Sequence, residues 1–160
     1  LTFEPPQGVN TNLANAGDFV EIPATTNDFK VSADKKIAVS LYMVGQSAQT
    51  GDSDPAMVMV VPTEQYRNSY LFFAATTWNA NYVDVIAPNG ANVTVDGNNV
   101  NNFAMIGATG YSIAHVTLSN NGNGNHTVMS NQKVGISVYG VQSYGSYWYP
   151  GGLDLDLIPQ

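Results

Sequence analysis

Charged side chains are scarce in this chain, and basic ones are scarcer than acidic ones. Of 160 residues, five are Lys or Arg and twelve are Asp or Glu, so the formal net charge is −7 and charged residues make up 11%. Soluble domains ordinarily contain about 25% charged residues. Binding to the phosphates of nucleic acids or to an anionic membrane relies on many basic side chains, and this chain has few. We therefore expect no nucleic-acid partner. Asn, Thr, Ser and Gly replace the missing charges, as is common on extracellular β-modules and virion proteins.

Cysteine and long apolar runs are also absent. Without cysteine the chain forms neither disulfides nor thiolate metal sites, which suits an exported bacterial protein that needs no cross-links. A membrane-spanning helix needs about 18 consecutive apolar residues, and no run approaches that length, so we expect no membrane insertion. The chain begins at Leu1 rather than Met and shows no signal peptide. We therefore expect an excised part of a longer exported protein, located outside the cell or on its surface.

Motifs for catalysis and for metal binding are missing or weak. The sequence has no Gly-x-Ser-x-Gly, no His-x-x-x-His and no phosphate-binding glycine loop. Asp52 and Asp54, like Asp154 and Asp156, place two carboxylates two residues apart, a spacing that suits Ca²⁺ or a pair of glycosidase acids. The first pair lies in a predicted loop and is a weak metal candidate, whereas the second is expected to solvate a strand. We predict a protein that is not an enzyme and has no cofactor.

Short runs of alternating apolar and polar residues, separated by Gly, Pro, Asn and Asp turns, dominate the chain. The runs that predict strands are residues 19–22, 29–31, 37–43, 56–61, 69–74, 81–86, 92–95, 99–105, 112–118, 126–129 and 134–139, and a final one contains Leu153, Leu155 and Leu157. Residues 56–61 are apolar on both sides, which is typical of a strand covered on both faces. We predict an all-β, two-sheet β-sandwich of jelly-roll or Greek-key type. Residues 1–17 are expected to be an extended lead and residues 18–160 a single domain.

Aromatic residues concentrate near the C-terminal end. Tyr144, Tyr147, Trp148 and Tyr149 precede residues 150–152, where proline fixes φ and two glycines allow positive φ, so we expect a sharp corner. Adjacent side chains of an extended segment point to opposite sides. We therefore expect Tyr149 to be buried in the core and Trp148 to be exposed and available for binding.

Motifs from Pro62 onward have a recognisable order. They are Pro62, Glu64-Gln65-Tyr66, Tyr70, Phe72, Asn81-Tyr82-Val83, Val93-Thr94-Val95-Asp96-Gly97, Tyr139-Gly140, Ser146-Tyr147 and Tyr149-Pro150-Gly151-Gly152. In order and rough spacing, over residues 29–157, they resemble the IgGFc-binding protein N-terminal domain family. The resemblance implies an extracellular binding domain with relatives on bacterial surfaces or fibres. Trp148 departs from the family's pattern, and residues 1–28 are expected to replace the first half of the family's domain.

Side chains suited to recognition of a carbohydrate or protein surface occur mainly in predicted loops. Flat rings stack on sugar faces, and amides bond to sugar hydroxyls. The candidate ligand-binding residues are Trp78, Asn79, Asn81, Tyr82, Asn121, Asn123, Tyr144 and Trp148. We predict a recognition or adhesion module that binds a host or prey surface glycan or glycoprotein through loops at one end of the sandwich. The alternative is a structural, self-assembling subunit or tip domain of a surface fibre or capsid, without a small ligand.

Low charge and surplus aromatic residues also favour self-association. Tyr42, Tyr82 and Trp148 fall on faces opposite the apolar sides of their predicted strands. A surface poor in Lys and Glu resembles an interface, and monomers avoid large exposed apolar patches. We expect a homo-oligomer, a trimer rather than a dimer, although the sequence has no coiled-coil heptads that would enforce a trimer.

Overall fold

The computed structural model describes residues 1–48 and 51–155, and nearly all of its regular structure is β-strand. The strands are β1 (Thr2–Glu4), β2 (Lys30–Ser32), β3 (Ser40–Tyr42), β4 (Met57–Met59), β5 (Arg67–Phe73), β6 (Ala80–Pro88), β7 (Val93–Val95), β8 (Asn98–Asn99), β9 (Ala104–Met105), β10 (Tyr111–Leu118), β11 (Asn125–Gln142) and β12 (Gly145–Pro150). Two single-turn 3₁₀ helices are η1 (Gln46–Ala48) and η2 (Thr63–Gln65). The prediction of an all-β fold is confirmed.

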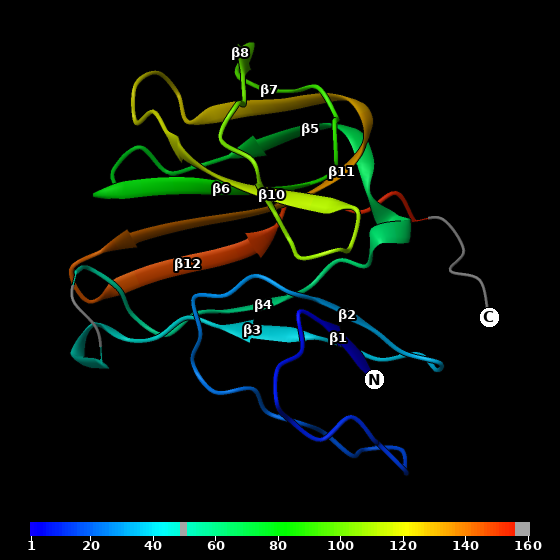
Figure 1. Cartoon of the computed structure of the whole chain (residues 1–160). Helices are drawn as coiled ribbons and strands as arrows, with labels where there is room; N and C mark the ends of the chain where they lie inside the picture. The colour runs from blue at the N-terminus through cyan, green and yellow to red at the C-terminus, as the bar shows by residue number, and fades with distance from the viewer. Residues whose placement is uncertain (49–50, 156–160) are drawn as a thin grey trace.

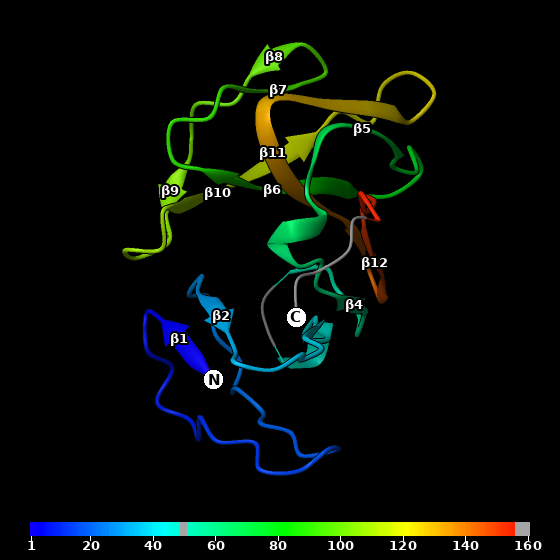
Figure 2. The same ribbon diagram turned by 90° about the vertical axis from the view of Figure 1, so that its right-hand side faces the viewer.

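One large sheet of eight strands forms the body of the domain. Its strands follow the order β8-β7-β11-β6-β10-β9, and β5 and β12 also pair with β11. The first part of β11 pairs with β5 and β7, and its last part pairs with β6 and β12. Figures 1 and 2 show β11 bending from one layer into the other. The sheet therefore curls over itself, which is consistent with the predicted sandwich.

The bend in β11 coincides with a change of register. The pairing with β5 shifts between Met129 and Val134, and such a bulge bends a strand and increases its twist. Residues 126–129 and 134–139, which we predicted as two strands, are thus parts of one strand of 18 residues. A single strand that serves both layers connects them without a loop.

The core lies between the two layers and consists largely of valine. Along β6, buried residues alternate with half-buried ones, so one face of the strand points inward. The buried hydrophobic cluster comprises Tyr70, Phe72, Ala74, Val83, Val85, Ala87, Val93, Val95, Leu118, Val128, Val134, Ile136 and Val138. β-Branched side chains fit the pleated surface of a sheet, and full burial of each valine contributes about 1.5–3 kcal/mol. This cluster provides the rigid support for the loops at both ends.

Two small antiparallel sheets, β1–β2 and β3–β4, lie beside the large sheet. The alternating run at residues 37–43 contributes only β3, in which Tyr42 is 69% exposed. Residues 56–61 contribute β4, of which only Val58 is buried, so the prediction of a strand covered on both faces is wrong. A two-stranded sheet offers no second layer to cover its outer face.

Two further predicted strands are wrong, and the N-terminal lead has a strand that we did not predict. Residues 19–22 have no regular structure, and Leu153 and Leu155 are exposed outside any strand. The last part of that predicted strand, Leu157, lies outside the described residues. Residues 1–17, expected as an extended lead, include β1, whose buried Phe3 has its ring centroid 5.9 Å from that of Phe29.

Candidate functional site

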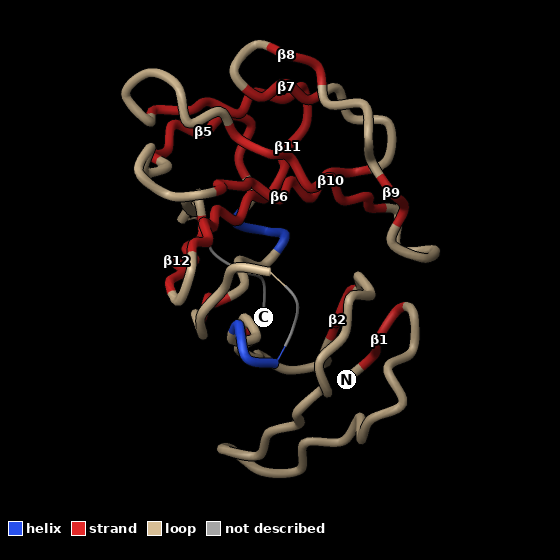
Figure 3. Tube along the Cα trace, turned by 90° about the vertical axis from the view of Figure 1, so that its left-hand side faces the viewer, coloured by secondary structure: helices blue, strands red, loops and turns tan. Residues whose placement is uncertain are grey.

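Four loops meet at one end of the sandwich, on the left-hand side of Figure 1 and facing the viewer in Figure 3. Three of them are residues 74–79 between β5 and β6, residues 119–124 between β10 and β11, and residues 143–144 between β11 and β12. The antiparallel register brings them together because Asn81, at the start of β6, lies opposite both Leu118 and Gly140. The fourth loop comprises residues 46–48 and 51–54. We call these four loops the end surface.

Asn81 lies beneath the end surface and ties its loops together. Its Nδ2 donates to the Ala75 carbonyl at 2.8 Å and to Asn120 Oδ1 at 2.7 Å, and its Oδ1 accepts from the Tyr147 hydroxyl at 2.5 Å. Asn120 in turn donates to the Trp78 carbonyl at 2.7 Å. Because Asn81 is fully buried, our prediction that it contacts a ligand is wrong. It is a structural residue that fixes the positions of two loops relative to β12.

Aromatic rings cover this buried amide. The half-buried ring of Trp78 meets the ring of Tyr147 edge to face, with centroids 5.0 Å apart and an interplanar angle of 84°. Tyr147 stacks on Tyr149 at 6.1 Å, and the Tyr149 hydroxyl donates to the Phe73 carbonyl at 2.5 Å. Burial of the ring raises the pKa of Tyr147 to about 12, and the neighbouring Tyr149 contributes to this shift to a smaller extent. These rings form a fixed base under the exposed part of the end surface.

The exposed part of the end surface contains Asn79, Asn121, Asn123 and Tyr144. Tyr144 is 72% exposed at a φ of 51°, and its N–H donates to Gln46 Oε1 at 2.9 Å. A tyrosine at positive φ is uncommon and costs conformational energy, so the turn holds this ring in solvent at some expense of stability. The structure thus brings six of the eight predicted residues to one end, five of them with accessible side-chain surface, as is common for binding loops on a rigid scaffold.

Side chains within these loops also hold one another. The Nδ2 of Asn79 donates to Asp52 Oδ2 at 2.6 Å, which connects the β5–β6 loop to the loop before β4. Asn123 Oδ1 accepts from the Asn125 N–H at 3.1 Å, and the Asn121 N–H donates to Ser119 Oγ at 3.1 Å. The tip of the β10–β11 loop is therefore shaped by its own asparagine and serine residues, as expected for Asx and ST turns.

Asp52 and Asp54, the weak metal candidates, have other contacts in the structure. One oxygen of Asp52 accepts from Asn79, and the Asp54 carbonyl accepts from the Ser146 hydroxyl. Within residues 1–48 and 51–155, no group of three or more His, Cys, Asp or Glu side chains is arranged to hold a metal ion.

Tyr82 and Trp148 lie away from the end surface, on the outer face of the layer formed by β10, β6, β11 and β12. Tyr139 lies opposite both in register and stacks on Tyr82 at 5.0 Å. Trp148 meets Tyr139 edge to face at 6.0 Å and donates from Nε1 to Ser137 Oγ at 2.5 Å. Tyr149 packs against the core cluster, so the predicted opposite orientations of residues 148 and 149 are confirmed. Both side chains are half-buried, so the predictions that Tyr149 is fully buried and that Trp148 is exposed are wrong. Trp148 belongs to a half-buried aromatic row and is not a free ring.

A histidine and two carboxylates adjoin this aromatic row. His115 Nδ1 lies 2.7 Å from Asp84 Oδ1, and its Nε2 lies 3.9 Å from Asp28 Oδ2. Burial raises the pKa of Asp84, and the hydrogen bond with His115 opposes that shift. Asp84 and His115 face each other because they are directly opposite in the β6–β10 ladder. The contact with Asp28, which no sequence pattern predicted, connects the N-terminal segment to the large sheet.

Comparison with known families relates most of the chain to other proteins. A model of the family described as IgGFc binding protein matches residues 1–140. The chain belongs to this family. The match includes residues 1–28, which we expected to replace the first half of the family's domain, and it ends before the aromatic corner at residues 144–152. No curated protein and no solved structure matches the chain. Among the described residues of this IgGFc binding protein family member, no helix is long and apolar enough to cross a membrane.

Proposed function

We propose that the chain is an extracellular recognition module that binds a protein or glycoprotein through the end surface. The observation that supports this most directly is the convergence of four loops, with their exposed aromatic and amide side chains, at one end of the sandwich. Membership of the IgGFc binding protein family supports a protein partner. The Fc region of immunoglobulin G is therefore the first partner to test.

The end surface has the chemistry of a weakly charged recognition site. Tyr144 offers a large amphipathic ring, and tyrosine is enriched among residues that dominate binding energy. Asn79 and Asn121 are exposed on the same end surface, and amides donate and accept hydrogen bonds. The buried Asn81 and the aromatic rings above it hold the loops before a partner arrives, so less conformational entropy is lost on binding.

The test measures binding of the 160-residue chain to immunoglobulin G Fc, intact and enzymatically deglycosylated, and to a panel of secreted glycoproteins by biolayer interferometry. The main variant is Tyr144→Asn, because asparagine tolerates the positive φ at this position. The control is Phe19→Ala, which removes an 84% exposed aromatic ring outside the end surface.

We expect Tyr144→Asn to weaken binding about tenfold or more, as for a central aromatic contact, and Phe19→Ala to leave it unchanged. Equal effects of the two variants would show that the end surface is not the binding site. Failure of every member of the panel to bind would refute the recognition function itself.

An assembling or structural role is the second candidate, and the exposed face of the β3–β4 sheet favours it. Tyr42 lies opposite Met57, and Met59 is two residues further along, so the three side chains share one face. They are 69%, 52% and 48% exposed, respectively. Contiguous apolar patches of this kind mark interaction sites. Multi-angle light scattering tests this role: a trimer has three times the chain mass of 17.1 kDa, and Tyr42→Ser should dissociate it, whereas a wild-type mass of one chain would exclude it.

A further inference from the structure

Three Asn-Gly pairs occur in the chain, at Asn89-Gly90, Asn121-Gly122 and Asn123-Gly124. Glycine has no Cβ, so its backbone nitrogen can approach a neighbouring group with little steric hindrance. In an Asn-Gly pair this nitrogen can attack the side-chain amide carbon of the asparagine before it. The local sequence is the same in all three pairs, whereas the folded structure treats each of them differently.

Asn89 is held in place by β10 and by the turn before it. Its Oδ1 accepts a hydrogen bond from the Ser112 hydroxyl at 2.6 Å, and its N–H donates to the Gly110 carbonyl at 2.9 Å. Ser112 is only 6% exposed, so water competes poorly for this bond. The amide of Asn89 must therefore leave a hydrogen bond before the Gly90 nitrogen can reach its carbon.

The Asn123-Gly124 pair is held on both of its residues. Asn123 Oδ1 accepts from the Asn125 N–H at 3.1 Å. Gly124 is buried, and its carbonyl accepts from the Ala74 N–H at 2.8 Å. A Cβ atom at Gly124 would lie 2.5 Å from the Ala74 carbonyl oxygen, so this glycine is packed against the end of β5. Neither the side chain nor the glycine backbone moves without loss of a contact.

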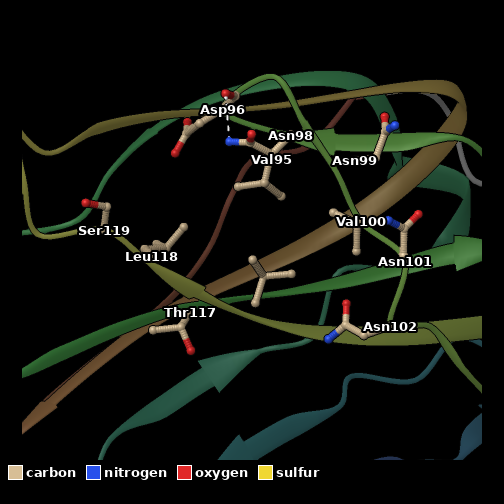
Figure 4. A pocket seen from close by; sticks show the side chains of 11 residues that line it. Val95, Asp96, Asn98, Asn99, Val100, Asn101, Asn102, Thr117, Leu118 and Ser119 are labelled. Atoms are coloured by element: carbon tan, nitrogen blue, oxygen red, sulfur yellow. Dashed lines mark hydrogen bonds between the residues drawn. The ribbon is translucent and has the colours of Figure 1, made fainter.

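The Asn121-Gly122 pair has no such restraints. Both residues are exposed, and the side-chain amide of Asn121 has no hydrogen-bond partner among the described residues. Its N–H donates to the hydroxyl of Ser119, which Figure 4 shows beside Leu118 where β10 ends and the loop begins. Around the Cβ position of Gly122, at a φ of 84°, no described atom beyond the chain neighbours lies within 4 Å. The amide and the glycine nitrogen are therefore free to approach each other.

We propose that Asn121 is a site of spontaneous modification, at which the folded chain converts an amide into a carboxylate. The Gly122 nitrogen loses its proton and forms a bond to Cγ of Asn121, while the bond from Cγ to Nδ2 breaks and Nδ2 leaves as ammonia. Water then adds to one of the two carbonyl carbons of the resulting cyclic imide and opens it to aspartate or isoaspartate. The reaction consumes only water and changes no oxidation state, so it needs no other reactant.

The product changes the end surface with time. Residues 119–124 contain no acidic side chain, and the reaction places a carboxylate among them, which adds one negative charge to the formal net charge of −7. Isoaspartate also inserts a methylene group into the main chain at the tip of this loop. The inference goes beyond the proposed recognition function, because the chemistry of Asn121 needs no partner and is tested without one.

Incubation of the 160-residue chain at mildly alkaline pH, followed by digestion and mass spectrometry at successive times, measures conversion at each asparagine. Asn121 should convert about three- to tenfold faster than Asn89 and Asn123, the factor that one hydrogen bond to be broken imposes on a rate. The same measurement on the chain unfolded in urea should give similar rates at the three sites, because the restraints of the fold are then lost.

A matched variant, Ser112→Ala, removes the hydroxyl that holds Asn89, so conversion at Asn89 should become faster while that at Asn121 stays unchanged. Three outcomes would overturn the proposal. In the first, Asn89 or Asn123 converts as fast as Asn121 in the folded chain. In the second, Asn121 stays intact in the folded chain over the time in which the unfolded chain converts. In the third, the three rates differ by the same factors in urea, which would assign the difference to sequence neighbours. Slower conversion of Asn89 in Ser112→Ala would refute the restraint by hydrogen bonding on which the ranking of the sites depends.

Discussion

Replacement of Asn81 by alanine tests whether one buried amide holds the end surface together. Asn81 makes three hydrogen bonds, to the Ala75 carbonyl, to Asn120 and with the Tyr147 hydroxyl. Each bond contributes roughly 0.5–1.5 kcal/mol net, and buried groups left without a partner cost about 1–3 kcal/mol each. Asn81→Ala therefore should lower the free energy of unfolding by about 3–5 kcal/mol, a large effect for one polar side chain.

Two control variants separate the hydrogen bonds from the general effect of mutating this region. Tyr147→Phe keeps the ring against the core and removes only the hydroxyl, so we expect a loss of about 1–2 kcal/mol. Asn121→Ala changes an exposed amide on the same end surface, so we expect about 0.5 kcal/mol or less. The double variant of Asn81 and Tyr147 should lose less than the sum of the single losses, because both remove the same bond.

Equilibrium unfolding in urea, followed by fluorescence and circular dichroism, measures these free energies. The dependence on denaturant should be the same for all variants if each unfolds in one cooperative transition. A loss below about 1 kcal/mol for Asn81→Ala, or one equal to that of Asn121→Ala, would refute the structural role of the buried amide.

Three further predictions concern the aromatic corner, the tyrosines and metal ions. Tyr149→Ala should cost about 3 kcal/mol and Trp148→Ala clearly less, because Tyr149 packs against the core; a larger loss at Trp148 in urea unfolding would contradict this. Burial raises the pKa of Tyr147 from 10.0 to about 12, so its stabilising effect is complete below pH 10 and declines as the pH rises from 10 to 12. Absorbance at alkaline pH should therefore show late tyrosine ionisation that Tyr147→Phe reduces, and ionisation of all tyrosines near pH 10 would be inconsistent with this. A chelator should leave the melting temperature unchanged, whereas a decrease that Ca²⁺ reverses would point to Asp52.

The strands of the large sheet were predictable because each buries one face. Residues 81–86 and 112–118, predicted from alternation, lie within β6 and β10. Both strands pair along their length and cover the same core. Every second side chain therefore points into the core and is apolar, and this alternation is visible in the sequence. Their ends extended by one or two residues beyond the prediction, because turns and pairing partners decide where a strand stops.

Alternation of apolar and polar residues did not predict strands correctly where no second layer is present. Residues 37–43 show the clearest alternation in the chain, yet only Ser40–Tyr42 form a strand, and Leu41 is 39% exposed. Residues 19–22 are apolar at Phe19, Val20 and Ile22, and they form no strand. Local patterns report which side of a segment is apolar, but they do not report whether another element covers it.

The sequence predicted which residue types occur at the candidate site, but it did not predict the role of each residue. Asn81 and Asn121 are the same residue type in neighbouring segments, and one is fully buried while the other is exposed. Asn120, which bonds Asn81 across 39 positions of sequence, was not predicted, because no local signal distinguishes it from the asparagines that follow.

The sequence by itself determined the all-β class, the weakly charged surface, the family and the amide-rich and aromatic composition of the loops, because these follow from local patterns and counts. The tertiary structure alone decided that residues near positions 52, 78, 121 and 144 meet at one end, and that Tyr82 and Trp148 do not join them. The physical reason is long-range antiparallel pairing. A shift of register within β11 bends that strand into both layers, and its partners then place loops that are far apart in sequence side by side.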